Sequence, residues 1–492
     1  MSLSLRASRA ARGIASRRRL VPLLVAVLAA CSPDQVVGSA DLPNDILDPA
    51  AVKTPAGAMA AYRGALVQLD AAFGGYQPYV VHFGHPNGSF IATTGLLSDE
   101  LQAGDLGGPL GTSSQYERVD ARTLPEYTDP STEPDATYRT TYSELQVVRA
   151  QARQAIGLLR TYAPDTSPAL TGHLYAVLGY TEVMLAELFC SGIPLTTVDF
   201  DGDYTLAPPS TTEEVLQHAV ALFDTALTLA ADSARVMNLA RVGKGRALLD
   251  LDRYAEAAQA VADVPDDFRY LENYYDQVTT TPDAFANFRY RPAGFAWFAT
   301  VSNGEGGTGL DYIASGDPRT AAVPDGGTNT YGVTLYVPAK YSASGDTPIV
   351  LADAIEAHLI RAEAALNAND PSWLATLNAL RTTCTDAASC PDPAPPGLGG
   401  VAGLPPLSDP GTRDARVDLL FRERAAWLFL TGHRQGDMRR LIRQYGRAPS
   451  AVYPTGSYPG GTGAYGTDVT APIPASERAF NPKFTGCVSR GA

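Results

Sequence analysis

The sequence is poor in the residues on which most metal sites and nucleophilic enzymes depend, with only 6 histidines and 5 cysteines among 492 residues. None of the cysteines stands in a CxxC spacing, which makes a zinc site improbable. GxSxG, HExxH and P-loop motifs are also lacking, so no catalytic machinery is recognisable. We therefore predict a protein that is not an enzyme and that needs neither a cofactor nor a metal.

Two short motifs come closest to a metal site, and neither completes one. His82 and His85 form an HxxH pair, but no further ligands are recognisable. The run DFDGDY at 199–204 begins like a calcium-binding loop. Its sixth position, however, is Tyr204 instead of glycine, and its twelfth is Ser210 instead of glutamate. An EF-hand is therefore not expected.

Basic residues are scarce as well. Removing the six arginines before residue 31 from the 38 basic residues leaves 32, against 52 acidic residues, so the rest of the chain has a net charge of −20. Such an acidic surface repels phosphate backbones, and a nucleic-acid partner is not expected. Hydrophobic residues make up 45% of the chain, which is enough to form a core.

Only one apolar run stands out, LVPLLVAVLAACSPDQ at 20–35. Its apolar part, 21–30, is shorter than the roughly 20 residues that cross a bilayer, and no other segment is long enough. Six arginines and no acidic residue precede it, which is the pattern of a secretory signal peptide. We therefore expect residues 1–30 to be removed on export.

The end of this leader reads Leu28-Ala29-Ala30-Cys31, which resembles the bacterial lipobox. The resemblance implies cleavage before Cys31 and a lipid anchor on its sulfur that holds the protein to a membrane. Stable anchoring takes more than one acyl chain, because a single chain binds only marginally. Residues 31–50 would then form a tether, and 51–492 the folded domain. The alternative is a plain secreted protein in which Cys31 is incidental.

The other four cysteines are expected to meet oxidising conditions after export, where disulfides persist. Cys384 and Cys390 flank the short run TDAAS, and we predict a disulfide between them. Cys190 and Cys487 could form a second bridge. Four cysteines allow three connectivities, and the sequence does not choose among them.

Amphipathic patterns predict a mainly α-helical domain. Residues 210–230 combine a capping-box spacing at Ser210 and Glu213 with apolar residues at helical intervals. Further helices are expected at 139–161, 168–190, 413–430 and 433–445. Two helices in about 34 residues have the length of a tetratricopeptide unit. We therefore expect stacked helix pairs at about 139–264 and 350–445.

Three stretches lack helical periodicity. Residues 101–136 and 385–412 are rich in Gly, Pro, Ser and Asp, and 265–348 is the longest. Long irregular segments on a rigid scaffold often carry binding sites. We therefore predict that 265–348 is the ligand-binding insert.

Seven segments, taken in order, resemble the SusD/RagB family of nutrient-binding outer-membrane lipoproteins. They are TTGLLSDEL, TYRTTYSELQVVRAQARQAI, GHLYAVLGYTEVMLAELFCSGIPLT, SGDPR, AHLIRAEAALNAND with LNALR, RERAAWLFLTGHRQGDMRRL and APIPASERAFNP. The resemblance covers nearly the whole chain after Cys31 and is strongest at 422–440 and 472–474. One departure is Cys190, where the family more often has an aromatic residue followed directly by glycine.

The resemblance implies a mainly α, SusD-like fold, in which tetratricopeptide-type helical pairs form a scaffold with long irregular loop insertions. It also implies a lipid-anchored position at the outer membrane, facing the cell exterior. The implied partner is a SusC-like TonB-dependent transporter. The implied role is to capture an oligosaccharide or oligopeptide and deliver it to that transporter.

The charged residues of these motifs suit architecture better than catalysis. Arg422, Glu423, Arg434, Asp437 and Arg440 are spaced for ion pairs across adjoining helical turns. We interpret His433 as a hydrogen-bonded residue at a helix junction. In GDPR, Asp317 and Pro318 favour a turn that Arg319 can fix by hydrogen bonds.

The insert is rich in aromatic side chains, which suit a sugar because both present an apolar face and a polar edge. Ten aromatic residues lie between 268 and 298. We expect most of them to pack against the helices and four to be exposed to the ligand. These four are Tyr274, Tyr275, Tyr290 and Trp297. Hydrogen bonds to sugar hydroxyls could come from Asn287, Arg291 and Asn303.

Three other functions remain open. An oligopeptide binder would replace stacking with backbone pairing and polar pockets. A scaffold of the cell envelope would use the helical repeats without any small ligand. A tethered hydrolase would need two carboxylates at a set separation, which a sequence does not reveal.

Overall fold

The computed structural model describes residues 52–76, 89–104, 113–134, 136–275, 286–287, 299–328, 334–383, 404–459 and 463–492. Lys53–Ala492 forms one compact unit. The leader, the tether and Cys31 lie outside the described residues. Within the described part, no helix has both the length and the apolar character needed to cross a bilayer.

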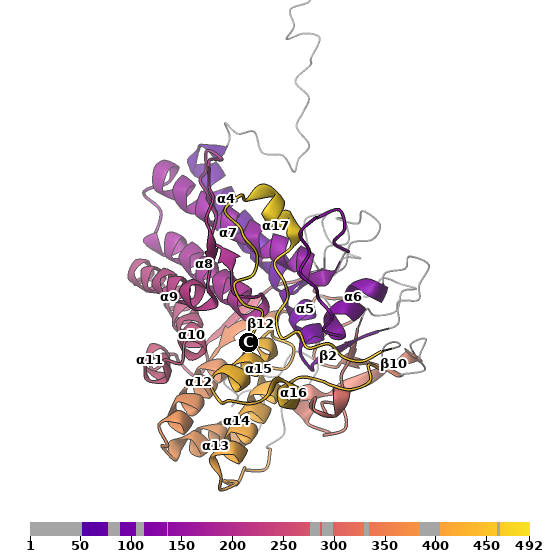
Figure 1. Cartoon of the computed structure of the whole chain (residues 1–492). Helices are drawn as coiled ribbons and strands as arrows, with labels where there is room; N and C mark the ends of the chain where they lie inside the picture. The colour runs from indigo at the N-terminus through magenta and orange to yellow at the C-terminus, as the bar shows by residue number, and fades with distance from the viewer. Residues whose placement is uncertain are drawn as a thin grey trace, which may run out of the picture. The chain divides into compact units, whose positions relative to one another are not determined.

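The N-terminal half of the unit is a stack of helices (Figure 1). Its first members are α4 (Pro55–Gly74), α5 (Phe90–Leu97), α6 (Ser113–Asp120), α7 (Thr137–Tyr162) and α8 (Pro168–Leu188). Thr54 and Ser167 cap α4 and α8, and each is followed by proline at the first helical position. The helices predicted at 139–161 and 168–190 are confirmed. Helix α6 corrects the prediction that 101–136 is irregular.

The stack continues through α9 (Thr212–Leu229), α10 (Ala234–Asp250) and α11 (Tyr254–Ala260). The predicted capping box is one residue out of place, because Thr211 and Glu214 form it. Ser210 and Glu213 have the same spacing, but Ser210 pairs with Ile193 in a small sheet, and the helix starts one residue later. A Cβ on Gly243 would lie 2.5 Å from the Phe223 ring, so glycine is needed where α9 and α10 meet.

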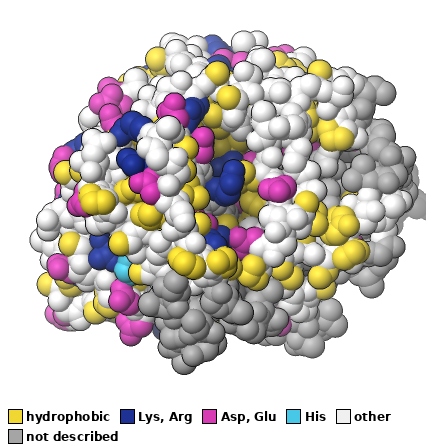
Figure 2. Space-filling view, turned by 90° about the horizontal axis from the view of Figure 1, so that it is seen from below, with side chains coloured by type: hydrophobic (Ala, Val, Ile, Leu, Met, Phe, Trp, Pro, Cys, Tyr) yellow, Lys and Arg dark blue, Asp and Glu magenta, His cyan; other side chains and the backbone are white. Residues whose placement is uncertain are grey.

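The C-terminal half repeats the arrangement. Its helices are α12 (Ala354–Asn367), α13 (Ser372–Thr383), α14 (Arg413–Trp427), α15 (Arg434–Arg443), α16 (Pro449–Val452) and α17 (Ala475–Phe480). The predictions at 413–430 and 433–445 are confirmed. Buried side chains of α12 to α15, including Leu359, Trp373 and Phe421, form one hydrophobic cluster. Figure 2 shows the end of the unit formed by α13 and α14.

Short antiparallel strands connect and cover the helices. The pairs are β1 (Gly75–Tyr76) with β8 (Ala286–Asn287), β2 (Leu101–Ala103) with β9 (Ala299–Val301), β3 (Ile193–Pro194) with β6 (Pro209–Ser210), β4 (Thr197–Val198) with β5 (Tyr204–Thr205), β7 (Arg269–Glu272) with β12 (Ile349–Asp353), and β10 (Ala322–Thr328) with β11 (Thr334–Pro338). The described part of 265–348 also holds two 3₁₀ turns, η1 (Glu305–Gly307) and η2 (Pro318–Thr320), and no α-helix. This agrees with its predicted lack of helical periodicity.

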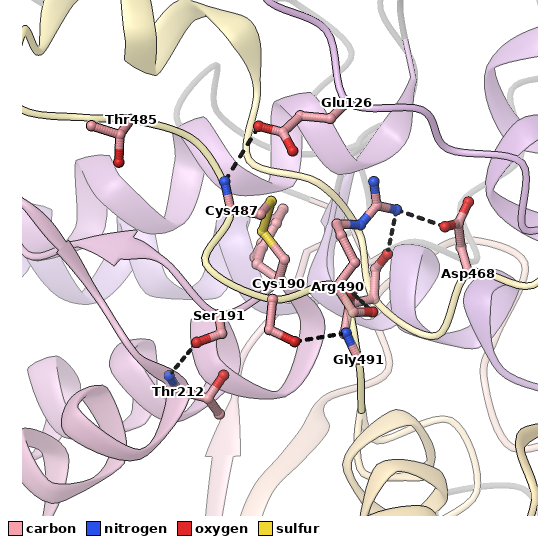
Figure 3. Close-up of a disulfide and its surroundings, with 12 residues drawn as sticks. Glu126, Cys190, Ser191, Thr212, Asp468, Thr485, Cys487, Arg490 and Gly491 are labelled. Carbon is pink, nitrogen blue, oxygen red and sulfur yellow. Dashed lines mark hydrogen bonds and ion pairs between the residues drawn. A yellow bond between two sulfur atoms is a disulfide. The ribbon is translucent and has the colours of Figure 1, made fainter.

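A disulfide fixes the C-terminal segment to the end of α8 (Figure 3). Cys190 and Cys487 are bonded, with their Cα atoms 5.9 Å apart, which confirms the second of the two bridges considered. Cys384 and Cys390 lie outside the described residues. The segment also hydrogen-bonds to the backbone of Ser191, which accepts from Val488 N at 2.7 Å. The end of the chain is therefore an integral part of the fold.

Candidate functional site

The base of the insert is held by a chain of buried polar groups. Tyr270, on β7, hydrogen-bonds through its hydroxyl to His173 Nε2 on α8 at 2.7 Å. Tyr62 on α4 contacts the other ring nitrogen, Nδ1, at 2.8 Å. Burial lowers the pKa of His173 to about 4, so the ring is neutral at pH 7. This chain ties the insert to two helices of the N-terminal half.

Tyr274 is part of this base, and the prediction that it is exposed is wrong. Its side chain is only 4% exposed, and its hydroxyl donates to the backbone carbonyl of Asp70 at 2.9 Å. Gly74 makes room for it, because a Cβ there would lie 2.9 Å from the Tyr274 hydroxyl oxygen and 2.5 Å from Ile349 Cδ1. Both constraints come from α4, some 200 residues earlier in the chain.

Tyr275, the next residue, is 52% exposed, which confirms its predicted exposure. Tyr290, Trp297 and Arg291 lie outside the described residues. Asn287 pairs through its backbone with Gly75. Asn303 accepts backbone hydrogen bonds from Ile313 and Ala314, so its amide oxygen shapes a loop.

Two pairs of carboxyl groups join the insert to the helices, Glu272 with Asp70 of α4 and Glu305 with Asp120 of α6. Burial raises the pKa of Glu272 well above its ordinary value, and the neighbouring Asp70 raises it further. Burial likewise raises the pKa of Asp120 to about 6, next to Glu305. Each pair is expected to retain a proton near neutral pH, because two adjacent buried carboxylates repel each other. The side chains of Asp120, Glu272 and Glu305 are buried, so these pairs are interpreted as structural.

The GDPR motif forms the turn that its residues predict. Asp317 accepts from the backbone nitrogen of Arg319 at 2.9 Å and starts η2. The Arg319 guanidinium donates to Asp317 and reaches Glu423 of α14 at 2.7 Å. Arg381 of α13 donates to the other oxygen of Glu423 at 2.6 Å. The motif therefore fixes the insert to the C-terminal helices.

Several charged residues of α14 and α15 are paired inside the protein. Arg424 and Arg440 both donate to Asp437, at 2.8 and 2.7 Å. Burial alone would raise the pKa of Asp437, but these two guanidinium groups hold it below its ordinary value. Arg434 pairs with Asp99 at 2.7 Å. Of the predicted ion pairs across adjoining turns, only that between Asp437 and Arg440 is confirmed. Glu423 and Arg434 are paired with residues of other segments, and Arg422 has no ion pair with a described residue.

His433 lies at the start of α15 and is buried. Its Nδ1 contacts the Thr431 hydroxyl at 2.9 Å, and its Nε2 lies 3.0 Å from Arg246 and 3.1 Å from Glu356. Burial lowers the pKa of the imidazole well below its usual value. It is the hydrogen-bonded residue at a helix junction that the sequence predicts.

The described residues contain no cluster of three or more side chains that could hold a metal ion. Asp199 Oδ1 accepts backbone hydrogen bonds from Asp201 and Asp203, so this carboxylate shapes its own loop. His82 and His85 lie outside the described residues.

The partners of these buried charges were missed at the sequence level. Asp250 and Glu363 form ion pairs with Arg440, and Glu187 forms one with Arg246. The usable signal is Glu363, which lies at helical spacing from the apolar residues Leu359 and Leu366. A charge on an apolar face indicates a buried partner, but it does not say which one.

Comparison with known proteins finds similar structures only. No protein family and no curated protein sequence matches the chain. The surface glycan-binding protein A of Bacteroides thetaiotaomicron, in complex with laminarihexaose, matches with a TM-score of 0.60 at 14% identity, covering 88% of this chain and 99% of that one. A laminarin-binding SusD-like protein gives 0.57 at 15% identity, with coverage of 89% and 99%. A SusD superfamily protein from Bacteroides vulgatus gives 0.58 at 14%, with the same coverage.

Proposed function

Because the chain has the SusD-like fold, we propose that it is a cell-surface lipoprotein that captures oligosaccharide and delivers it to a SusC-like TonB-dependent transporter. The observation that carries the proposal is this likeness. It extends over 88% or more of the chain to two proteins whose names state that they bind laminarin or contain laminarihexaose.

Tyr275 is the described residue best suited to stack on a sugar. It is half-exposed, while the neighbouring Tyr274 is buried and hydrogen-bonded and holds the backbone in place. A tyrosine ring offers an apolar surface to the CH face of a sugar. Its side chain loses little conformational entropy on binding, because it has only two rotatable bonds. Binding by stacking and hydrogen bonding accelerates no reaction, so the proposed protein is not an enzyme.

Anchoring is the second part of the proposal. A diacylglyceryl group on Cys31 would hold the body near the outer membrane, where a transporter can receive the sugar. The supporting observation is the lipobox resemblance behind a basic, apolar leader. Mass spectrometry of the native protein tests it, because an unmodified Cys31 or a retained leader contradicts the anchor.

The glycan part is tested by native electrophoresis of the purified protein in gels that contain polysaccharide, starting with laminarin. We expect retardation, and we expect the Tyr275→Ala variant to bind about 2- to 10-fold more weakly because a stacking contact is lost. Tyr204→Ala is the matched control, since Tyr204 is 71% exposed on β5, outside the insert.

Failure of every polysaccharide to retard the protein contradicts the glycan assignment. If a peptide mixture then binds, the oligopeptide alternative replaces it. Copurification with a large β-barrel without any small ligand indicates the scaffold alternative. Release of products from a glycan panel contradicts the non-enzymatic assignment.

A further inference from the structure

A hollow of about 260 Å³ lies between the GDPR turn, the C-terminal end of α13 and α14. Figure 2 shows this face, where basic side chains stand among hydrophobic and acidic ones around a depression in the surface. The hollow is smaller than the roughly 300–1,000 Å³ pockets that take drug-sized ligands, and it is expected to hold a small unit instead of a long chain.

Most charged groups of the hollow are already paired. Both oxygens of Asp317 accept from Arg319, and both oxygens of Glu423 accept from Arg319 or Arg381. Arg319 also lies 4.8 Å from the centre of the Trp427 ring. These groups form a rigid floor whose carboxylates are neutralised, so they do not repel an incoming anion strongly.

Two guanidinium groups keep donors for a ligand. Arg422 is exposed on α14 and has no hydrogen bond or ion pair with any described residue. Arg381 uses Nε for the Pro405 carbonyl and Nη1 for Glu423, which leaves Nη2 without a partner among the described residues. Guanidinium groups bind carboxylates through paired hydrogen bonds. Asp311 is the one lining carboxylate without a described partner, so it would oppose an anion.

Leucines provide the rest of the wall. Leu310, Leu407 and Leu419 line the hollow, and each is partly exposed. A ligand that fits must therefore combine an apolar face with an anionic group. A sugar ring that carries a carboxylate has both, with its CH face for the leucines and its carboxylate for the arginines.

We propose that this hollow binds a uronic acid unit, with Arg422 and Arg381 holding the carboxylate. The sugar part of this assignment rests on the proposed function, while the carboxylate part rests on the hollow alone. The hollow and Tyr275 belong to different elements of the fold, so the two sites can be tested separately.

Isothermal titration calorimetry with a matched pair of ligands tests the proposal. The probes are methyl glucuronoside and methyl glucoside, which differ only at C6. The glucuronoside carries a carboxylate there, and the glucoside carries a hydroxymethyl group. We expect the glucuronoside to bind at least about tenfold more tightly, because a charged hydrogen-bonded pair is lost with the glucoside. Equal binding of the two, or no binding of the glucuronoside, overturns the proposal. Cyclohexanecarboxylate is the third probe, and binding as tight as the glucuronoside's overturns the sugar part.

Variants locate the binding. Arg422→Gln should weaken the glucuronoside about tenfold or more and leave the glucoside unchanged. Arg413→Gln is the control, since Arg413 also lies on α14 but pairs with Asn367 and does not line the hollow. Asp311→Asn should strengthen binding, because it removes the opposing charge. An unchanged affinity in Arg422→Gln overturns the proposed site.

The two proposals fail separately. Retardation by a neutral polysaccharide without any glucuronoside binding removes this inference and leaves the proposed function intact. If cyclohexanecarboxylate binds as tightly as the glucuronoside, both depend on Arg422, and no polysaccharide retards the protein, the carboxylate part is supported and the proposed function is contradicted.

Discussion

Arg440 on α15 donates from Nη2 to Glu363 on α12 at 3.0 Å, and both side chains are almost completely buried. From Nη1 the same guanidinium reaches Asp250 on α10, also at 3.0 Å. One side chain therefore connects the N-terminal helices to the C-terminal ones. The two regions of predicted helix pairs are joined by this buried charge as well as by apolar packing.

We expect Arg440→Met to lower the free energy of unfolding by about 3–5 kcal/mol, because the buried carboxylates of Asp250, Glu363 and Asp437 would each lose an ion pair. Chemical denaturation measures the change. Arg416→Met is the control, since Arg416 forms an exposed pair with Asp409 and should cost less than about 1 kcal/mol. Equal losses in the two variants would mean that the buried network contributes no more than a surface pair.

Helix positions were predictable from the sequence because amphipathic spacing is a local signal. Helices α7, α8, α14 and α15 agree with it closely. The pairing of Arg440 was not predictable, because Asp250 and Glu363 are 190 and 77 residues away. Periodicity shows that a residue is buried, but it does not identify its partner.

The residues proposed for ligand binding show the same limit. Tyr274 and Tyr275 are adjacent and chemically identical, and composition gives no reason to separate them. The difference comes from α4, where the Asp70 carbonyl accepts from Tyr274 and Gly74 leaves space for its ring. Arg422 was expected to pair like its neighbours, yet it lies on the exposed side of α14, next to the hollow.

The two tyrosines should respond differently to removal of the hydroxyl. Tyr274→Phe leaves the Asp70 carbonyl without its side-chain donor and should cost about 0.5–1.5 kcal/mol of stability. Tyr275→Phe should change stability by less than about 0.5 kcal/mol, because its side chain is half-exposed. Chemical denaturation of both variants provides the comparison, and a larger loss for Tyr275→Phe would contradict the assigned burial.

Stability should fall as the pH rises from about 4 to 6, in part because of Asp120. Its pKa is raised from the ordinary 3.8 to about 6, chiefly by burial, so the folded state holds this proton more tightly than the unfolded chain. This contribution to stability is complete when the pH is below the pKa of Asp120 in the unfolded chain. It is lost as the pH rises through the pKa of Asp120 in the folded state.

Replacing the carboxyl group removes this dependence. We expect the stability of the Asp120→Asn variant to decline less between pH 4 and 6 than that of the unmodified protein. At pH 8 the variant should be the more stable of the two. Melting temperatures across this range measure it, with the exposed Asp267→Asn as control. A steeper decline of stability in the Asp120→Asn variant would contradict the raised pKa assigned to Asp120.

The disulfide should contribute measurably to stability. Cys190 and Cys487 are 297 residues apart in sequence, so their bond restricts the unfolded chain strongly. We expect the double variant Cys190→Ser, Cys487→Ser to lose about 2–5 kcal/mol. Adding a reductant to the unmodified protein should lower its melting temperature and leave that of the variant unchanged. Equal sensitivity to reductant in both would place the effect at another site.

The bond between Cys190 and Cys487 also closes most of the body into a covalent ring. A protease that cuts once at an exposed loop inside this ring makes a new pair of chain ends, yet the two pieces stay attached through sulfur. Such a nicked molecule would run as a single species on a gel without reductant and as two bands with it. This linkage would therefore preserve the assembled body after a first cut.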